Sequence, residues 1–392
     1  MKTLKRTWAD ISLDNLEYNY RSIRAHLPQG TKFLGVMKAD AYGHGAVPVS
    51  RALADLGAEY LAVSNLEEAV QIRRGEVRLP ILILGYTPAE YAANMIFLDI
   101  TQEVHSLEYA RELNEALAGT NYILNVHLKL DTGMTRIGFF AYDNERTLDE
   151  LRQVAQLPHL HIEGAFMHFC VADSRAEADV SFTKLQYKRF MDMLSAMAGV
   201  GIRPEIRHCC NSGATILYPE FALDMVRPGI ITYGNAPSDE LEGALSLRPM
   251  MSLHSMIAQV RTVPAGTDIS YGRLYRTTHD TRVAVLPIGY ADGLPRLLAG
   301  KASFYLQGHQ VPVIARICMD MCMIDVSNVP EAKPGDVVTI FGYDDDGTLL
   351  PCARLARAQG TINYELLCQI RMRIPRICHR GAETSQMLQY IV

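Results

Sequence analysis

Short apolar runs alternate with amphipathic segments between residues 32 and 232. The runs have the length and apolar content of buried strands, and the segments between them, such as 48–56 and 183–197, place apolar residues at helical spacing. Eight strands that alternate with helices predict a parallel (β/α)8 barrel. An open doubly wound sheet would need a GxGxxG turn after its first strand, and the chain has none there. The predicted strands lie at 32–38, 59–64, 80–85, 96–101, 124–130, 161–168, 205–211 and 225–232.

The pattern changes after residue 241, where helical spacing gives way to strand-like segments separated by Gly and Pro turns. A chain of 392 residues exceeds what a single core usually organises, so two domains are expected. We predict a barrel domain at 1–241 and a C-terminal, mostly β domain at 242–392. The chain begins with an alternating strand at 8–13, which is followed by a helix that starts near Ser12. The prediction leaves open whether this first strand packs with the barrel or with the β domain. The later strand-like segments lie at 255–263, 282–288, 310–315 and 336–341.

Composition and charge exclude several classes of protein. The chain carries a formal net charge of −5, so it offers no basic surplus to neutralise a nucleic-acid backbone. It holds no run of about 20 apolar residues that would span a membrane. Its basic first residues lead into a strand-like segment rather than the apolar core of a secretion signal. We therefore expect a cytoplasmic protein that binds neither nucleic acid nor a membrane.

The spacing of cysteine and histidine gives no sign of a disulfide framework or a metal site. The eight cysteines are scattered along the chain without CxxC pairs, which is typical of reduced thiols. His159 and His161 lack accompanying cysteine or carboxylate ligands at metal-binding spacing. We interpret these two histidines as a polar strand face and expect no metal.

Cations and hydrogen-bond donors follow several of the predicted strands. The chemistry of a barrel gathers at the C-terminal ends of its strands. Lys38 closes the first strand, where partial desolvation would make its amine a nucleophile or a base. Each such residue has an ordinary structural explanation alone, but together they indicate an anionic ligand, cradled in part by backbone amides near Gly229. The other residues at these ends are Lys129, Arg136, His168, Asn211, Ser212, Gly213, Arg227, Pro228 and Ile230.

Seven ordered motifs, spread over both predicted domains, resemble those of the alanine racemase family, whose members are pyridoxal phosphate (PLP) enzymes with a barrel fold. The first motif is shared with related PLP barrels, whereas those around Tyr271 and Cys318 are the discriminating ones. Departures from the family pattern are modest: Met321, Thr232 and the adjacent Cys209 and Cys210. The motifs are 36–45 (VMKADAYGHG), 129–138 (KLDTGMTRIG), 227–230 (RPGI), 270–273 (SYGR), 289–293 (GYADG), 318–320 (CMD) and 361–365 (TINYE).

The resemblance implies a two-base inversion at the Cα atom of an amino acid. Lys38 would hold PLP covalently, and PLP would serve as the electron sink. Lys38 would transfer the proton on one face of the substrate, and Tyr271 would transfer it on the other. His168 and Arg227 would support Tyr271 through a hydrogen-bonded line, and Asp320 would support the same face. Arg227 would also face the pyridine nitrogen and leave it unprotonated, because arginine does not give up its proton.

The resemblance also assigns the remaining contacts. Arg136 would reach the cofactor's phenolic oxygen and help to bind the substrate, and Met319 would contact the substrate carboxylate through its backbone. Lys129 would be carbamylated and would position Arg136. The cofactor would be bound by Lys38, Tyr42, Arg136, His168, Asn211, Ser212, Arg227, Gly229, Ile230 and Tyr364, and the corridor to the site would be lined by Asp173, Tyr290, Arg296 and Arg316.

The second domain of the family reaches the active site of the other subunit, and it contains Tyr271, Tyr290, Met319 and Asp320. The resemblance therefore implies a homodimer with composite sites that racemises alanine and supplies D-alanine for peptidoglycan precursors of the cell wall. Tyr364 would crowd a substrate side chain much larger than methyl. The alternatives are a racemase of another small amino acid such as serine, a PLP-barrel decarboxylase of basic amino acids, and a non-catalytic PLP carrier built of the barrel alone.

Overall fold

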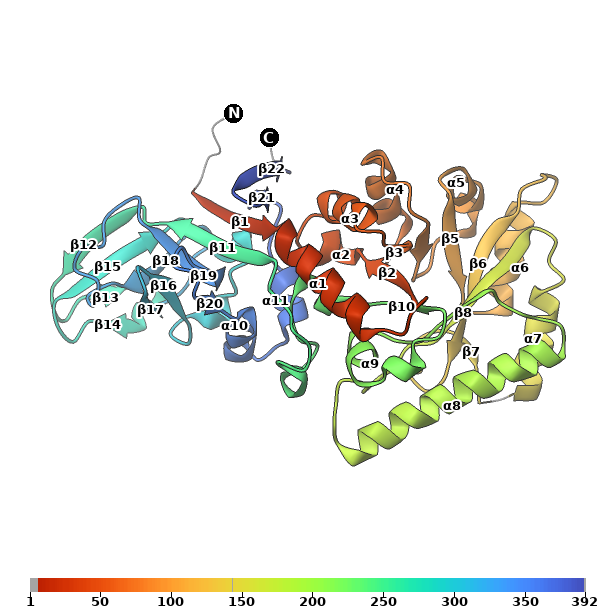
Figure 1. Ribbon diagram of the computed structural model, residues 1–392. Helices are drawn as coiled ribbons and strands as arrows, with labels where there is room; N and C mark the ends of the chain where they lie inside the picture. Colours follow the sequence, from red (N-terminus) through yellow and green to blue (C-terminus); the bar gives the residue numbers. More distant parts are fainter. Residues whose placement is uncertain (1–5, 143, 391–392) are drawn as a thin grey trace. The chain divides into compact units, whose positions relative to one another are not determined.

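The computed structural model describes residues 6–142 and 144–390, which form two compact units. The barrel unit consists of Leu16–Ala41 and Ala46–Arg248, and the β unit consists of Met1–Asn15, Tyr42–Gly45 and Pro249–Val392 (Figure 1). The last piece begins downstream of the boundary predicted after residue 241. Residues 1–5, which belong to the basic segment considered above as a possible secretion signal, lie outside the described residues.

The barrel unit is a ring of parallel strands in the order β10-β2-β3-β4-β5-β6-β8-β9. Two backbone hydrogen bonds join the ends of this series, from the Asp224 amide to the Arg207 carbonyl (3.1 Å) and from the Arg227 amide to the Cys210 carbonyl (2.9 Å). The predicted (β/α)8 barrel is therefore confirmed. Its strands are β2 (Lys32–Val36), β3 (Tyr60–Val63), β4 (Ile81–Ile83), β5 (Ile100–Val104), β6 (Leu124–Asp131), β8 (Leu160–Phe166), β9 (Ile206–His208) and β10 (Met225–Val226), and the short β7 (Phe139–Phe140) pairs with β6.

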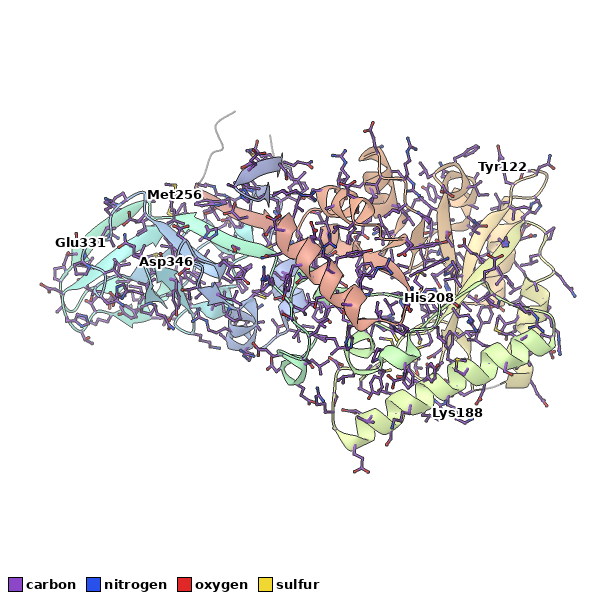
Figure 2. All side chains as sticks on the ribbon, viewed as in Figure 1. Tyr122, Lys188, His208, Met256, Glu331 and Asp346 are labelled. Atoms are coloured by element: carbon purple, nitrogen blue, oxygen red, sulfur yellow. The ribbon has the colours of Figure 1, made fainter. Side chains whose placement is uncertain are left out.

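Helices α3 to α8 lie around the outside of these strands (Figure 1). The predicted helix at 183–197 falls within α8 (Glu177–Gly199), which buries Thr183, Gln186, Phe190 and Met193 at helical spacing. Its opposite face carries the exposed Lys188 (Figure 2). The other helices are α1 (Leu13–His26), α2 (Lys38–Tyr42), α3 (Ala46–Asp55), α4 (Leu66–Arg74), α5 (Ala92–Phe97), α6 (Leu107–Ala116), α7 (Asn144–Val154) and α9 (Ser212–Leu217), with 3-10 turns η1 (Ala89–Tyr91), η2 (Pro219–Phe221), η3 (Ile230–Tyr233) and η4 (Asp239–Leu241).

One barrel strand was predicted too early in the chain. The apolar run that begins at Ile96 predicts a strand at 96–101, but α5 continues to Phe97 and β5 begins only at Ile100. Asp99 separates the two elements with a φ of 51°, and the Phe97 side chain remains 70% exposed. A short apolar run has the same composition at the end of a helix as in a strand, so periodicity did not distinguish them.

The β unit is built on a sheet in the order β12-β15-β18-β17-β16-β19-β11-β1-β21-β22, with β20 paired to β19. The first strand, β1 (Thr7–Ser12), lies in this sheet between β11 and β21. The segment predicted at 255–263 is two strands with different partners, since β11 (Met251–Met256) pairs with β19 and β12 (Gln259–Val263) pairs with β15. The other strands are β13 (Asp268–Ile269), β14 (Tyr275–Arg276), β15 (Thr281–Leu286), β16 (Ser303–Leu306), β17 (His309–Ile314), β18 (Cys322–Asp325), β19 (Val337–Tyr343), β20 (Leu349–Leu350), β21 (Arg376–Arg380) and β22 (Glu383–Leu388).

Short helices complete the β unit: η5 (Tyr271–Arg273), η6 (Tyr290–Asp292), η7 (Arg296–Leu298), α10 (Cys352–Gln359) and α11 (Asn363–Cys368). All eight cysteines of the chain are free thiols, as predicted. Within 6–142 and 144–390, no helix has the length and apolar character needed to cross a membrane.

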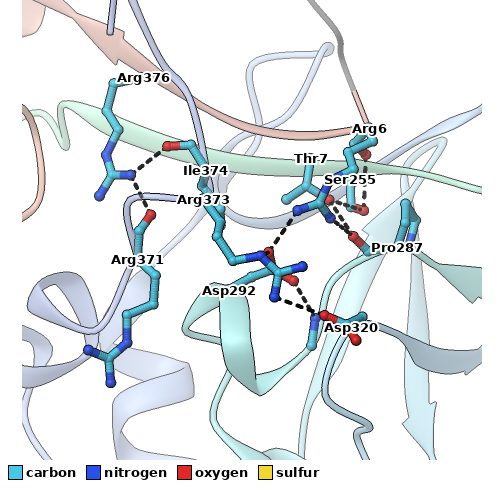
Figure 3. Close-up of polar contacts among 11 residues, drawn as sticks. Arg6, Thr7, Ser255, Pro287, Asp292, Asp320, Arg371, Arg373, Ile374 and Arg376 are labelled. Carbon is cyan, nitrogen blue, oxygen red and sulfur yellow. Dashed lines mark hydrogen bonds and ion pairs between the residues drawn. The ribbon is translucent and has the colours of Figure 1, made fainter. Parts of the chain in front are cut away.

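A buried arginine fixes the start of β21. The Arg376 guanidinium donates to the carbonyls of Gly43 (2.9 Å), Ile370 (2.8 Å), Arg371 (2.7 Å) and Ile374 (2.5 Å). Figure 3 shows two of these contacts. A buried carbonyl that loses its donor costs about 1–3 kcal/mol, so one side chain stabilises several loop segments at once.

We predict that Arg376→Leu lowers the free energy of unfolding of the β unit by about 3 kcal/mol or more, because several buried acceptors lose their donor together. Urea unfolding can be followed by the fluorescence of Trp8, the one tryptophan of the chain, which lies in β1 next to β21. Arg380→Leu, on the exposed end of the same strand, is the control and should leave the unfolding midpoint unchanged. Equal midpoints for the two variants would contradict this account.

Candidate active site

A left-handed turn follows the first barrel strand. Ala39, Asp40, Ala41 and Tyr42 have φ values of 53°, 52°, 55° and 52°. This conformation costs an L-residue about 1–2 kcal/mol, and the sequence has no glycine there to relieve it. The Ala41 amide donates to the Met37 carbonyl (2.8 Å), which closes the turn. The exposed Lys38 thus stands at the junction of a buried strand and an unusual backbone turn.

Two carboxylates hold this turn within the barrel unit. Glu68 of α4 accepts from the amides of Ala39 (2.7 Å) and Ser64 (2.8 Å), so it joins the ends of β2 and β3. Asp40 accepts from the Ala46 amide (2.7 Å) at the start of α3. These charge-assisted hydrogen bonds offset the backbone strain and fix the position from which Lys38 extends.

Arg227 is buried beside the ends of β8 and β9. Its guanidinium donates to the carbonyls of Met167 (2.7 Å), His208 (3.0 Å) and Cys209 (3.1 Å). It also contacts Nδ1 of His208 (3.0 Å) and Nδ1 of His168 (3.3 Å). Burial lowers the pKa of Arg227 to about 10, which leaves the side chain positively charged at neutral pH. Because the cation must donate, both imidazole Nδ1 atoms act as acceptors.

His168 lies where several cations converge. Burial lowers its pKa well below the ordinary value, and the charges of Arg227, Lys129, Arg136 and Lys38 lower it further. Lys38, Arg136 and Arg227 follow three different barrel strands, and Lys129 lies near the end of β6. The neutral imidazole can accept one hydrogen bond and donate another without adding a positive charge.

Arg227 is the first member of a line of hydrogen bonds that continues inside the barrel. Nε2 of His208 lies 2.9 Å from Nδ1 of His127, and Nε2 of His127 lies 3.0 Å from a Glu163 oxygen. Tyr60 donates to the other Glu163 oxygen (2.9 Å). With Arg227 donating to His208, each histidine must be a neutral ring that donates from Nε2. Burial lowers the pKa of both histidines, which agrees with this assignment.

Sequence reasoning missed His208, His127 and Glu163, which continue the line of hydrogen bonds from the predicted Arg227. Figure 2 places His208 among the barrel strands. The available signal was the alternation in β6, where His127 and Lys129 are separated by one residue and therefore share a face of the strand. A histidine in an apolar strand has the same local pattern whether it is solitary or part of a network.

Lys129 is buried beside this network. Its Nζ donates to the Leu130 carbonyl (3.1 Å) and lies 5.4 Å from the centre of the Phe166 ring. Burial, and then the charge of Arg227, lower the pKa of Lys129 to about 8. A substantial fraction of the amine is therefore neutral and nucleophilic near that pH.

The segments after β9 and β10 meet at a hydroxyl. The Gly229 amide donates to Ser212 Oγ (2.9 Å), and both residues are buried. Asn211 caps α9 by accepting from the Ala214 amide (3.0 Å), so it shapes this loop. Ile230 begins η3, which Tyr233 joins to β2 by donating to the Val36 carbonyl (2.6 Å).

Asp173 lies against the same loop. A Cβ atom added to Gly213 would lie 2.8 Å from the Asp173 Cβ, so the two segments are in direct contact. Burial raises the pKa of Asp173, and the negative charges of Glu240 and Asp179 raise it further. Asp173 therefore borders the site through its backbone packing.

The β unit presents the other predicted residues on open loops. Tyr271 is 69% exposed and Met319 is 53% exposed, and with Asp320 they line a groove of about 670 Å³. Tyr290 and Arg296 are also exposed, and the guanidinium of Arg316 lies 3.4 Å from the position of a Cβ on Gly272. Tyr42 and Tyr364 face each other elsewhere in this unit, with ring centres 6.1 Å apart.

Two family models match the chain in order. The alanine racemase N-terminal domain matches residues 11–237, and the alanine racemase C-terminal domain matches residues 250–378. The chain belongs to the alanine racemase family. The resemblance inferred from the seven motifs is therefore confirmed, together with the fold class of a barrel and a mostly β domain.

Relatives of the family match this chain over nearly its whole length. The alanine racemase of Desulfovibrio desulfuricans is 45% identical over 370 residues, which are 94% of this chain and 97% of the relative. That of Clostridium tetani is 40% identical over 392 residues, which are 100% of both chains. Among solved structures, the alanine racemase of Clostridium difficile 630 has a TM-score of 0.94 at 39% identity, with 100% of both chains covered. The Bacillus anthracis alanine racemase with bound L-Ala-P has a TM-score of 0.92 at 33% identity, covering 100% of this chain and 99% of that one.

A glycine beside the histidine pair gives a test of the buried network. A Cβ on Gly164 would lie 2.5–2.6 Å from three atoms of the His127 ring. We predict that Gly164→Ala displaces His127, lowers the free energy of unfolding by about 1–3 kcal/mol and reduces turnover. Gly199→Ala, where nothing lies within 4 Å of the new Cβ, is the control. Thermal unfolding and steady-state rates are measured for both variants. If Gly164→Ala has the melting temperature and turnover of the parent, the buried network contributes to neither stability nor activity.

Proposed function

We propose that this chain interconverts L- and D-alanine, with PLP as its cofactor, in a cytoplasmic homodimer that supplies D-alanine for peptidoglycan precursors. The observation that carries the proposal is the buried Arg227, fixed between His168 and His208, in a barrel that also provides Lys38 at a strand end. The relatives named above are alanine racemases, and alanine racemases use PLP. The match to both domains of the family disfavours a carrier made of the barrel alone.

The chemistry of the available donors fits PLP. Lys38 offers an amine for the aldehyde, and Arg227 offers a guanidinium for the pyridine nitrogen. Ser212 and the amides of Gly229 and Ile230 offer uncharged donors suited to a phosphate, with Tyr42 and Tyr364 as further candidates. Asn211 supports the phosphate end by capping α9. Arg136 is assigned to the phenolic oxygen and the substrate, and Met319 to the substrate carboxylate.

Bound PLP supplies an electron sink that acidifies the Cα hydrogen of an amino acid attached to it. Arg227 would keep its own proton and donate a hydrogen bond to the ring nitrogen of bound PLP. An unprotonated ring nitrogen would withdraw less charge from Cα, which would favour return of a proton over loss of the carboxyl group. The geometry therefore supports racemisation better than decarboxylation.

Inversion needs a proton-transfer group on each face of the substrate, and we assign Lys38 to one face and Tyr271 to the other. Asp320 supports the second face, and His168 joins Arg227 to it. We assign Tyr271, Tyr290, Met319 and Asp320 to the active site of a second copy of the chain. The open groove supports this assignment, because it leaves apolar side chains such as Met319, Met321 and, in part, Met323 open to solvent, and a second copy would cover them. Asp173, Tyr290, Arg296 and Arg316 would line the corridor to the site.

The two assigned bases can be tested by substitution. Incubation with PLP and L-alanine in heavy water should give D-alanine and deuterium at Cα. Lys38→Ala and Tyr271→Phe should each lower turnover by about 100-fold or more, because each removes a proton-transfer group. Circular dichroism and proton NMR measure inversion and exchange. Tyr122→Phe, in a loop of the barrel unit, is the matched control and should match the parent.

Other outcomes of the same experiment select the alternatives. Release of CO₂ from a basic amino acid would identify a decarboxylase, and faster inversion of serine than of alanine would change the substrate. Full activity of Tyr271→Phe would remove Tyr271 from its assigned role.

Lys129 is proposed to carry a carbamate that positions Arg136. The amine attacks CO₂ to form a C–N bond and releases one proton, and only the neutral amine reacts. Since the pKa of Lys129 is about 8, we predict that at fixed CO₂ pressure carbamate rises with pH through that value. Carbon-13 NMR with labelled CO₂ measures this signal. Lys129→Met should lack it, and its absence from the parent at high pH would contradict the proposal.

A further inference from the structure

Asp292 is a buried carboxylate that the proposed reaction does not use. Its side chain has 0% exposure, and it accepts from the Gly289 amide (3.0 Å) and from Arg6 (2.8 Å). Nε of Arg373 lies 3.5 Å from the same oxygen that Arg6 contacts. A buried carboxylate must be paired to remain charged, and two arginines pair this one (Figure 3).

Arg373 also contacts a second acid. Its Nη1 lies 2.8 Å from Asp320, whose side chain is 51% exposed. An ion pair this exposed is a weak source of stability. Its effect is orientational, because one end of the guanidinium lies at a fixed, buried carboxylate and the other at the rim of the groove.

The two acids lie on loops that are in direct contact. The Tyr290 amide donates to the Cys318 carbonyl (3.1 Å), and the Ala291 amide donates to the Met319 carbonyl (3.0 Å). A Cβ on Gly289 would lie 2.3 Å from the Met319 oxygen, so only glycine permits this approach. Arg373 therefore crosses the junction at which Met319 is held.

The same rim extends to the loop that carries Tyr271. Ser270 Oγ donates to the Arg316 carbonyl (2.9 Å), two residues before Cys318. The loops with Tyr271, Tyr290 and Met319 are thus connected in series. Arg6 still pairs Asp292 if Arg373 is removed, so the buried carboxylate keeps one cation.

We propose that Arg373 is a positioning residue that bridges Asp292 to Asp320 and thereby fixes the loop on which Met319 meets the substrate carboxylate. This inference rests on the proposed function. Arg373 does not touch the reacting atoms, and it acts through Asp320 and the backbone of the rim. Its chemistry suits the task, because a planar guanidinium presents donors in two directions and spans both acids, whereas a lysine ammonium is a single point charge.

Hydrogen exchange tests the bridge without reference to activity. In Arg373→Met, the amides of Cys318, Tyr290 and Ala291, which donate within and between these loops, should exchange about tenfold faster. Arg371→Met, two residues away, changes an exposed arginine whose side chain touches neither acid in Figure 3 and should exchange like the parent. Unchanged exchange of the three amides in Arg373→Met would overturn the proposal.

Steady-state kinetics test the link to the substrate. Arg373→Met should raise KM for alanine about tenfold with little change in kcat, because it loosens binding rather than proton transfer. Arg373→Lys should recover only part of this loss, and it serves as the second variant if Arg373→Met does not fold. Asp320→Asn combined with Arg373→Met should add little to either single change. A parental KM in both variants would overturn the proposal, whereas a parent that does not racemise alanine would overturn the proposed function and leave the exchange test standing.

Discussion

A buried positive charge is the constraint on which the barrel and its site both depend. The Arg227 guanidinium cannot be left without acceptors in the interior, and it finds them at the Met167, His208 and Cys209 carbonyls, where β8 and β9 end. The Arg227 amide donates to Cys210, so the same residue helps to close the ring of strands. Arg227 therefore closes the barrel through its backbone and places a positive charge at the strand ends through its side chain. Because the guanidinium donates to His168 and His208, both histidines are held as neutral acceptors.

The barrel could be predicted because the apolar residues of its strands and helices recur at regular spacing. This spacing can be recognised without knowing which strands pair. Lys38, Lys129, His168 and Arg227 could be placed at strand ends by the same argument. The line from His208 through His127 to Glu163 could not, because it depends on strand register, which no local pattern determines. The position of β5 was missed for a different reason: the apolar end of α5 has the composition of a strand.

The left-handed turn after Lys38 shows where local propensity gives the wrong expectation. Residues 39–42 are Ala, Asp, Ala and Tyr, none of which favours positive φ as glycine does. Contacts from Glu68 and Asp40 override that preference. Arg373 escaped prediction similarly, because the motif around Asp320 is visible in the sequence while its partner comes much later in the chain. In both places the sequence identifies the functional side chain, Lys38 or Asp320, but does not identify the residues that hold it in position.

The charges around His168 lead to a last conclusion about the ligand. Arg227, Lys129, Arg136 and Lys38 all lower the pKa of His168, so their positive charges act on one small region. The nearest acid on β6, Asp131, is occupied by the amides of Gly133 (2.9 Å) and Thr135 (3.0 Å). Charges of one sign gathered in a poorly solvated site repel each other strongly unless an anion joins them. A phosphate and a carboxylate from ligands, and a carbamate on Lys129, would each supply negative charge where the protein itself supplies little.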